Sequence, residues 1–264
     1  ANFAYHVSQF GFDSCAISAI GDDELGQEII DTFDKVGLHY CLPKVNFPTG
    51  TVQVTLNDKG IPQYEICLGV AWDNIPLTEE LLSIAKEAKA VCFGSLAQRS
   101  ATSRATINAM LEAMPADTLK VFDINLRQHY FNEEIVCNSM NKADILKIND
   151  EEIIVVAEML NITGKSQKEI CEVLLDRFAL KMVILTCGDK GSYVLTAQES
   201  SWVDTPKVNV VSTVGAGDSF TGTFIASILL GKTIRQAHEA AVRVSAYVCT
   251  CQGAMPAIPQ DLLF

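Results

Sequence analysis

The sequence has few basic residues, few histidines and no long apolar run, and each shortage narrows its possible functions. Its 264 residues include 20 Lys and Arg against 32 Asp and Glu, a formal net charge of −12. This excess of acid argues against nucleic acid or an anionic membrane as a partner. No run of about 18 apolar residues occurs, so no membrane-spanning helix is expected. The four histidines are scattered without the spacing of a metal site.

Two common nucleotide-binding motifs are also missing. No G-x-G-x-x-G opens a helix after a first strand, which argues against a dinucleotide-dependent oxidoreductase. The segment Gly164-Lys165-Ser166 looks like the end of a P-loop, but that motif needs glycine where Met159 stands. The P-loop interpretation is therefore rejected, and the oxidoreductase is left as a disfavoured alternative.

The nine cysteines include no C-x-x-C pair. Cys92, Cys171 and Cys249 lie within apolar runs, where cysteine behaves as a small buried hydrophobe. An odd number of cysteines with this core-like placement indicates reduced thiols. We therefore expect a cytoplasmic protein.

Short apolar runs alternate with helical patterns along most of the chain. The runs typical of buried parallel strands are at 90–94, 119–123, 144–148 and 182–186. Helical patterns occur at about 22–36, 77–88, 101–114, 150–160, 167–180, 216–230 and 234–250, and a late hairpin at 191–203. This order predicts an α/β fold with a doubly wound, mainly parallel sheet flanked by helices.

Residues 38–70 differ from the rest of the chain. They contain three β-like runs at 39–42, 51–56 and 63–67, with a turn signal at 57–60. We expect a small β-rich lid here, inserted into an α/β core formed by residues 1–37 and 71–264.

The segment Gly215-Ala216-Gly217-Asp218 is the most informative in the chain. The apolar run after it has helical spacing, so the glycines lie at a helix N-terminus. Free backbone N–H groups and the helix dipole make that position an anion site. A carboxylate repels a phosphate, so the presence of Asp218 beside an anion site needs an explanation. A role as the general base for an attacking hydroxyl would provide one. The alternative is a plain glycine-rich turn with Asp218 favoured by the dipole.

Polar residues follow several predicted strands at their carboxyl ends, where ligands bind in such sheets. Arg127 follows one strand, and its guanidinium could bind phosphate or form a surface salt bridge. Asn149 follows the next strand and could bind phosphate, or cap the following helix with Glu152 in its first turn.

Five segments in this order resemble the motifs of the PfkB/ribokinase family of sugar and nucleoside kinases. They are Ala1–Ala4 reaching Gly11, Gly21–Gly26, Asn149–Glu152, Thr186–Gly191 and Gly215–Asp218. The resemblance implies a ribokinase-like fold. It implies that Asp218 is the catalytic base and that the amides of Gly215, Ala216 and Gly217 form the anion hole.

The resemblance implies further roles. Asn2 would bind the sugar, although it could instead cap the helix that follows. Asn149 and Glu152 would hold phosphate and, through water, Mg²⁺. Thr186, Gly188 and Gly191 would contact ATP, although the two glycines could equally form a hairpin turn. Gly253 lies in a segment that loosely matches the loop beside the adenine.

Residues 69–75 and 122–127 are similar to the fructokinase branch of the family. This implies ATP- and Mg²⁺-dependent phosphorylation of fructose to fructose 6-phosphate, with Arg127 in the active site. Trp72 would border the sugar, or serve only packing. The alternatives are a kinase for another sugar or sugar acid, and a catalytically silent sugar-binding relative. Lids of this type often pair subunits, so a homodimer is expected.

The sequence departs from the family pattern at two places. Relatives often have Asp where Ser212 stands, and that carboxylate helps to hold a monovalent cation. We therefore expect weak dependence on K⁺. The family's Gly-Gly, its first strand and a sugar-binding Asp precede the segment that begins at Ala1. We expect the natural protein to extend upstream and to carry them.

Overall fold

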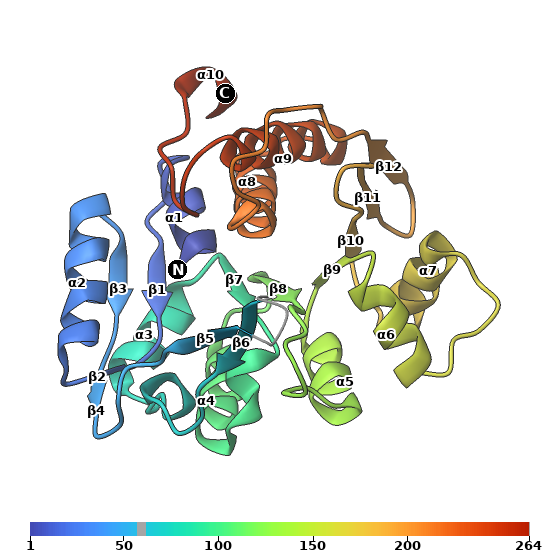
Figure 1. Cartoon of the computed structure of the whole chain (residues 1–264). Coiled ribbons are helices and arrows are strands. Elements are labelled where there is room, and N and C mark those ends of the chain that lie inside the picture. Colours follow the sequence, from blue (N-terminus) through green and yellow to red (C-terminus); the bar gives the residue numbers. More distant parts are fainter. Residues whose placement is uncertain (57–61, 264) are drawn as a thin grey trace. The chain divides into compact units, whose positions relative to one another are not determined.

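The computed structural model describes residues 1–56 and 62–263 (Figure 1). The turn expected at 57–60 lies outside these residues. The chain divides into two compact units. The larger unit consists of Ala1–Ser14, Ala88–Leu96 and Pro115–Phe264, and the smaller unit of Cys15–Glu87 and Ala97–Met114.

A six-stranded sheet in the order β12-β11-β10-β9-β8-β7 forms the centre of the larger unit. Its strands are β7 (Ala90–Phe93), β8 (Leu119–Asp123), β9 (Ile145–Asn149), β10 (Met182–Thr186), β11 (Ser192–Leu195) and β12 (Ser200–Val203). Strands β7 to β10 are parallel, whereas β11 and β12 are antiparallel. The predicted mainly parallel sheet with a late hairpin is confirmed.

Helices pack against this sheet from both faces (Figure 1). The helices of this unit are α1 (Asn2–Ser8), α5 (Glu133–Lys142), α6 (Glu152–Met159), α7 (Gln167–Arg177), α8 (Ala216–Leu229), α9 (Ile234–Cys249) and α10 (Gln260–Leu263). Of these, α1 packs mainly on α8, and α10 packs on α9. Phe220 and Phe224 of α8 share a buried core with Val121, Ile145 and Ile184 of the strands. Helices α5, α6 and α7 contact β8, β9 and β10 respectively.

In the smaller unit, the described residues form three two-stranded sheets. Strand β1 (Cys15–Ile17) pairs in parallel with β3 (His39–Cys41), β2 (Ile20–Gly21) pairs in parallel with β4 (Lys44–Val45), and β5 (Val52–Leu56) pairs antiparallel with β6 (Pro62–Ile66). Its helices are α2 (Glu24–Val36), α3 (Glu79–Glu87) and α4 (Ala101–Ala113), with a 3-10 turn η1 (Ala71–Asp73); a second, η2 (Leu96–Arg99), begins in the larger unit.

This unit is larger than the 38–70 segment expected to form a lid. The reason is that β3 and β4 pair with β1 and β2, which precede α2 in the chain. Helix α2 begins where the Asp23 side chain accepts the Gly26 N–H at 2.8 Å, and it ends at Gly37 with a φ of 67°. The role of the β-rich segment as a lid stays a prediction.

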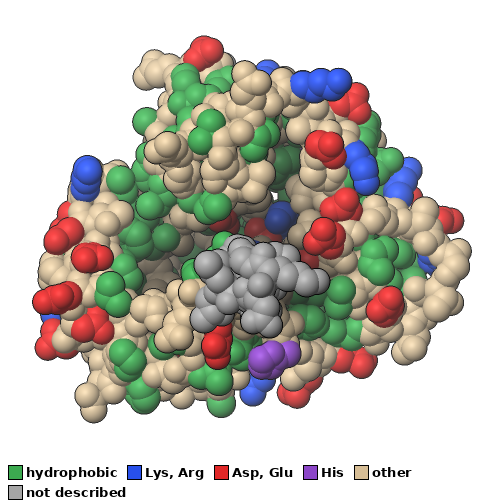
Figure 2. Space-filling model, in the orientation of Figure 1, with side chains coloured by type: hydrophobic (Ala, Val, Ile, Leu, Met, Phe, Trp, Pro, Cys, Tyr) green, Lys and Arg blue, Asp and Glu red, His purple; other side chains and the backbone are tan. Residues whose placement is uncertain are grey.

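The surface reflects the acidic composition. Figure 2 shows carboxylate side chains spread over the visible face, as the net charge of −12 leads one to expect. None of the described helices is long and apolar enough to cross a membrane. None of the nine cysteines forms a disulfide in the part of the chain that the structure describes.

Candidate active site

Helix α8 begins at the glycine turn that the sequence singled out. Gly215 is its N-cap, with a left-handed φ of 84°, and its carbonyl accepts the first bond of the helix, from Ser219 N–H, at 2.8 Å. The N–H of Ala216 already donates to Thr213 O at 3.2 Å. The N–H groups of Gly217 and Asp218 come before the helical ladder, so they are the ones that an anion could use.

The chain near Gly253 packs directly on this turn. A Cβ at Gly215 would lie 2.7 Å from the Cα and Cβ of Ala254, so glycine is required for the close approach. The carbonyl of Ala254 lies 2.9 Å from Nε2 of buried His6, on α1. Burial lowers the pKa of His6. The segment around Gly253 is thereby held between α1 and the start of α8.

Asp218 is oriented by Asn2. The Asn2 side-chain amide donates to Asp218 Oδ2 at 2.9 Å, across 216 residues of sequence. The alternative role of Asn2 as a helix cap is wrong, because Ala1 is the N-cap of α1 and no side chain caps that helix. Close packing of the two helices makes the contact possible: a Cβ at Gly222 of α8 would lie 2.9 Å from the Cβ of His6.

A buried ion pair that the sequence reasoning missed lies beside this turn. Asp123 and Lys147 are direct partners in the β8–β9 register, and Lys147 Nζ lies 3.2 Å from Asp123 Oδ1. Their side chains are 4% and 5% exposed. Both lie on the sheet face covered by α8, because they follow the core residues Val121 and Ile145 at the two-residue period of a strand.

The sequence contains one sign of this pair: a charged residue, Lys147, lies inside the apolar run 144–148. A buried charge needs a partner. Burial disfavours the charged form of Lys147, but the carboxylates of Asp123 and Glu152, with a further contribution from Asp218, outweigh it and raise the pKa of Lys147 above its ordinary value. Lys147 therefore carries a positive charge at the start of α8.

Asn149 and Glu152 make the capping contacts that were the alternative to a binding role. Asn149 Oδ1 accepts the N–H groups of Glu151 and Glu152 at 2.9 and 2.8 Å. Glu152 Oε2 accepts the Asn149 N–H, and Oε1 accepts the Leu126 N–H, both at 3.0 Å. Each carboxylate oxygen keeps one lone pair. Among the described residues no group of three His, Cys, Asp or Glu side chains could hold a metal ion, and a contact of Glu152 with Mg²⁺ through water stays a prediction.

Arg127 is exposed, in the loop after β8. Its guanidinium donates to the carbonyl of Leu126 at 3.1 Å and to Oδ1 of Asn125 at 3.2 Å. Among the bonds that the structure describes, Arg127 therefore forms no salt bridge with a carboxylate, which was the alternative to phosphate binding. Its catalytic role stays a prediction.

The expected nucleotide residues lie at the ends of neighbouring strands. Thr186 is the register partner of Asn149, at the carboxyl ends of β10 and β9. Gly188 and Gly191 have positive φ angles of 57° and 143° in the turn from β10 to β11. A Cβ at Gly191 would lie 2.6 Å from the Trp202 ring, so this glycine is required by the hairpin itself. A nucleotide contact there remains a prediction.

Trp72 belongs to the smaller unit, in η1. The Arg99 guanidinium lies 4.1 Å from the centre of its ring and forms an ion pair with the neighbouring Asp73 at 2.8 Å. A Cβ at Gly50 would lie 2.1 Å from Trp72 Nε1, so the ring packs on that glycine. These contacts give Trp72 a packing role, and its contact with a sugar stays a prediction.

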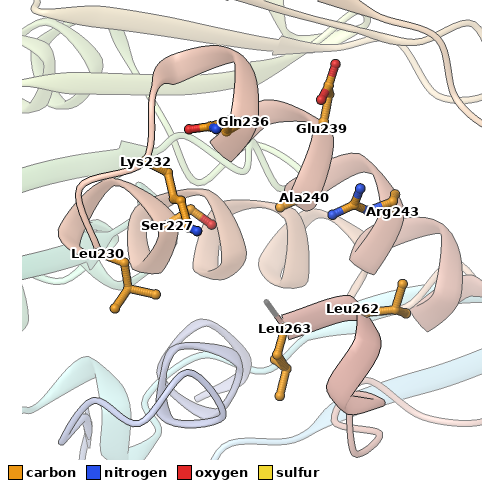
Figure 3. Close-up of a pocket in the computed structure, with 9 residues that line it drawn as sticks. All are labelled: Ser227, Leu230, Lys232, Gln236, Glu239, Ala240, Arg243, Leu262 and Leu263. Carbon is orange, nitrogen blue, oxygen red and sulfur yellow. The ribbon is translucent and has the colours of Figure 1, made fainter.

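A cavity of about 170 Å³ lies at the other end of α8, between α8, α9 and α10 (Figure 3). Ser227, Leu230, Lys232 and Arg243 are among its lining residues. Ser227 follows Asp218 by nine residues in α8, about 14 Å along the helix axis. This cavity is therefore separate from the glycine turn.

Comparison with known proteins connects this geometry to a family. A family model described as pfkB family carbohydrate kinase matches residues 1–261. Fructokinase-2 of Oryza sativa subsp. japonica is 28% identical over 275 residues, which cover 98% of this chain and 80% of that protein.

Solved structures share the fold. The ribokinase of Thermotoga maritima has a TM-score of 0.78 and 24% identity, over 99% of this chain and 84% of that one. A fructokinase from Vibrio cholerae O395, crystallised with fructose, ADP and calcium, has a TM-score of 0.81 and 23% identity, over 99% of this chain and 88% of that one. The predicted ribokinase-like fold is confirmed.

Proposed function

The chain belongs to the pfkB family of carbohydrate kinases, and from this premise we propose that it transfers the γ-phosphate of ATP to fructose, giving fructose 6-phosphate. The similarity to rice fructokinase-2 and the resemblance of residues 69–75 and 122–127 to fructokinases support the choice of sugar. The observation that carries the proposal is the contact between Asn2 and Asp218, which holds a carboxylate beside the anion-binding end of α8.

Asp218 would act as the general base. Asn2 occupies its Oδ2 at 2.9 Å, which leaves Oδ1 to accept the proton of the sugar hydroxyl. A positioned base contributes about 10²–10⁴-fold to such a step. The N–H groups of Gly217 and Asp218 and the positive end of the α8 dipole would stabilise the charge on the transferred phosphoryl group.

Mg²⁺ would supply charge neutralisation on the phosphates of ATP. Glu152 would contact it through water, because both carboxylate oxygens already accept backbone N–H groups. Asn149, Thr186, Gly188 and Gly191 would line the nucleotide near the carboxyl ends of β9 and β10, with Gly253 beside the adenine. Arg127 would reach the phosphates after a change of side-chain rotamer.

We also propose a homodimer formed through β5 and β6. Val52, Val54 and Tyr64 are 53%, 57% and 61% exposed, and Val54 and Tyr64 are register partners in this hairpin. Adjacent exposed apolar side chains on one face of a hairpin favour burial against a second copy of the chain. Sedimentation of the wild type against Tyr64→Lys is the test: the proposal requires a dimer that the substitution weakens.

The central experiment measures ADP release over a panel that contains fructose, ribose and a sugar acid, with and without Mg²⁺. We expect release with fructose that requires Mg²⁺. Release with another sugar alone would correct the substrate, and sugar binding without any ADP release would identify a silent relative.

The Asp218→Asn variant tests the base. We expect kcat to fall by about 10²–10⁴-fold while ATP binding is kept, because the shape and one hydrogen-bonding oxygen remain. Asp117→Asn, a substitution of an exposed carboxylate before β8, is the matched control and should leave kcat unchanged. Equal turnover by Asp218→Asn and the wild type would remove the assignment.

A further inference from the structure

We propose that Lys147 is a further catalytic residue, whose ammonium binds an oxygen of the transferred phosphoryl group, and that Asp123 is the residue that positions it. This inference rests on the proposed kinase function and deepens it. The starting observation is the buried positive charge of Lys147. Neither the glycine turn nor Asp218 explains why a cation is buried there.

The tip of Lys147 lies against the start of α8. An ideal Cβ at Gly217 would be 3.1 Å from Nζ and 3.9 Å from Cε, so it is the charged end that faces the turn. Gly217 has no positive φ, so its backbone conformation does not demand glycine. The approach of the ammonium does favour glycine, because a Cβ at Gly217 would lie closer to Nζ than an ordinary van der Waals contact and Lys147 would have to shift.

The ammonium has more donors than partners. It carries three N–H groups. Within the described residues, Asp123 Oδ1 at 3.2 Å is the one ion-pair or hydrogen-bond partner of Nζ. The side chain is only 5% exposed, so water has little access to the remaining donors. Leaving such donors unpaired is costly, and phosphoryl oxygens at the anion-binding end of α8 would satisfy them.

The charges around Lys147 explain why a cation is needed. The carboxylates of Asp123, Glu152 and Asp218 all act on its ammonium. Three negative groups would repel a phosphoryl group from the site, and the backbone N–H groups offset this only in part. A positive charge next to Gly217 reduces the repulsion while Asp218 remains free to act as a base.

Asp123 holds the ammonium in place. It faces Lys147 across β8 and β9, and Thr221 Oγ1 lies 3.5 Å from its other carboxylate oxygen. The Thr221 hydroxyl also lies 2.9 Å from Gly217 O, and because it carries one proton it donates to only one of these two oxygens at a time. The alternative is that Lys147 serves only to neutralise buried Asp123.

The experiment compares the wild type with Lys147→Met and with the double variant Lys147→Met/Asp123→Asn. The double variant removes both charges, so it leaves no unpaired buried carboxylate and should fold where the single variant does not. Lys181→Met is the control, because Lys181 pairs with Asp144 at 2.8 Å just outside β9 and is 58% exposed. Circular dichroism and thermal melting establish that each variant is folded.

We expect the double variant to lose about 10²–10³-fold in kcat, the effect of one lost donor to a developing anion. Its affinity for ATP, measured by calorimetry with Mg²⁺, should fall by roughly 10–100-fold, as for a hydrogen bond to a charged group. Its affinity for ADP, which lacks the γ-phosphate, and its KM for the sugar should change little. Lys181→Met should match the wild type.

A folded double variant with wild-type kcat and ATP affinity would overturn the inference and leave Lys147 a structural partner of Asp123. Equal losses of ATP and ADP affinity would also overturn it, because a general distortion would then be the cause. With either result, the proposed kinase function still holds as long as the wild type is active. A wild type that binds no ATP and phosphorylates no sugar refutes the proposed function and this inference together.

Discussion

Acidification should destabilise the protein through His238. This histidine, on α9, is fully buried, and its ring joins the two strands of the late hairpin. Nε2 lies 2.8 Å from the hydroxyl of Ser192 on β11, and Nδ1 lies 2.9 Å from the hydroxyl of Ser201 on β12. A neutral imidazole, with one donor and one acceptor, suits two hydroxyl groups. Burial, with help from nearby Arg235, lowers the pKa of His238 to about 4.

The direction and size of the effect follow from this value. The ordinary pKa of 6.5 applies in the unfolded chain, so between pH 6.5 and about 4 the unfolded state binds a proton that the folded state does not. The free energy of unfolding therefore falls as pH is lowered through this window and is unaffected by His238 above it. At about 1.36 kcal/mol per pH unit over about 2.5 units, the loss is at most about 3.4 kcal/mol.

Urea unfolding between about pH 4 and pH 8 measures this effect in the wild type and in His238→Gln. The glutamine does not titrate, so the difference between the two stability curves should shrink or reverse as pH falls from 6.5. His129→Gln, which removes an exposed histidine, is the control and should follow the wild type. If the curves of wild type and His238→Gln run parallel across the window, His238 is charged in the folded protein and the reasoning is wrong.

Two further substitutions separate function from stability. Gly217→Val should lower kcat by roughly 10²–10³-fold with little change in melting temperature, because its side chain would block the anion-binding N–H groups beside Lys147; normal kinetics with a collapsed melting temperature would make this glycine structural. Gly191→Ala should lower the free energy of unfolding by about 1–3 kcal/mol, because its Cβ would meet Trp202 at 2.6 Å and its φ is positive; unchanged urea stability would contradict this.

The fold could be predicted largely from local pattern. The strands β7 to β12 and most helices lie within a few residues of the apolar runs and helical periods in the sequence. Helix α5 was missed, because 133–142 contains few apolar residues, and its start depends on the Asn132 side chain capping Ile135 N–H. The short strands β1, β2 and β4 have two or three residues each, too few to show a period.

Part of the candidate site is likewise determined by residues that are adjacent in the sequence, and part of it is not. The glycine turn, Asp218 and the helix behind them are consecutive in the chain, so helical spacing and free N–H groups identify an anion site without any tertiary information. The capping of α6 by Asn149 and Glu152 is local too, and the sequence reasoning named it as an alternative.

Only the tertiary structure decided which distant groups meet at that turn. Asn2 reaches Asp218 across 216 residues, Ala254 packs on Gly215, and Lys147 faces Gly217 after pairing with Asp123. Helical and strand periods report which face of an element is apolar, but they carry no information on which elements lie side by side. That order and register arise from the burial of α8 against the sheet, which places Lys147 beneath the turn that the sequence had already identified.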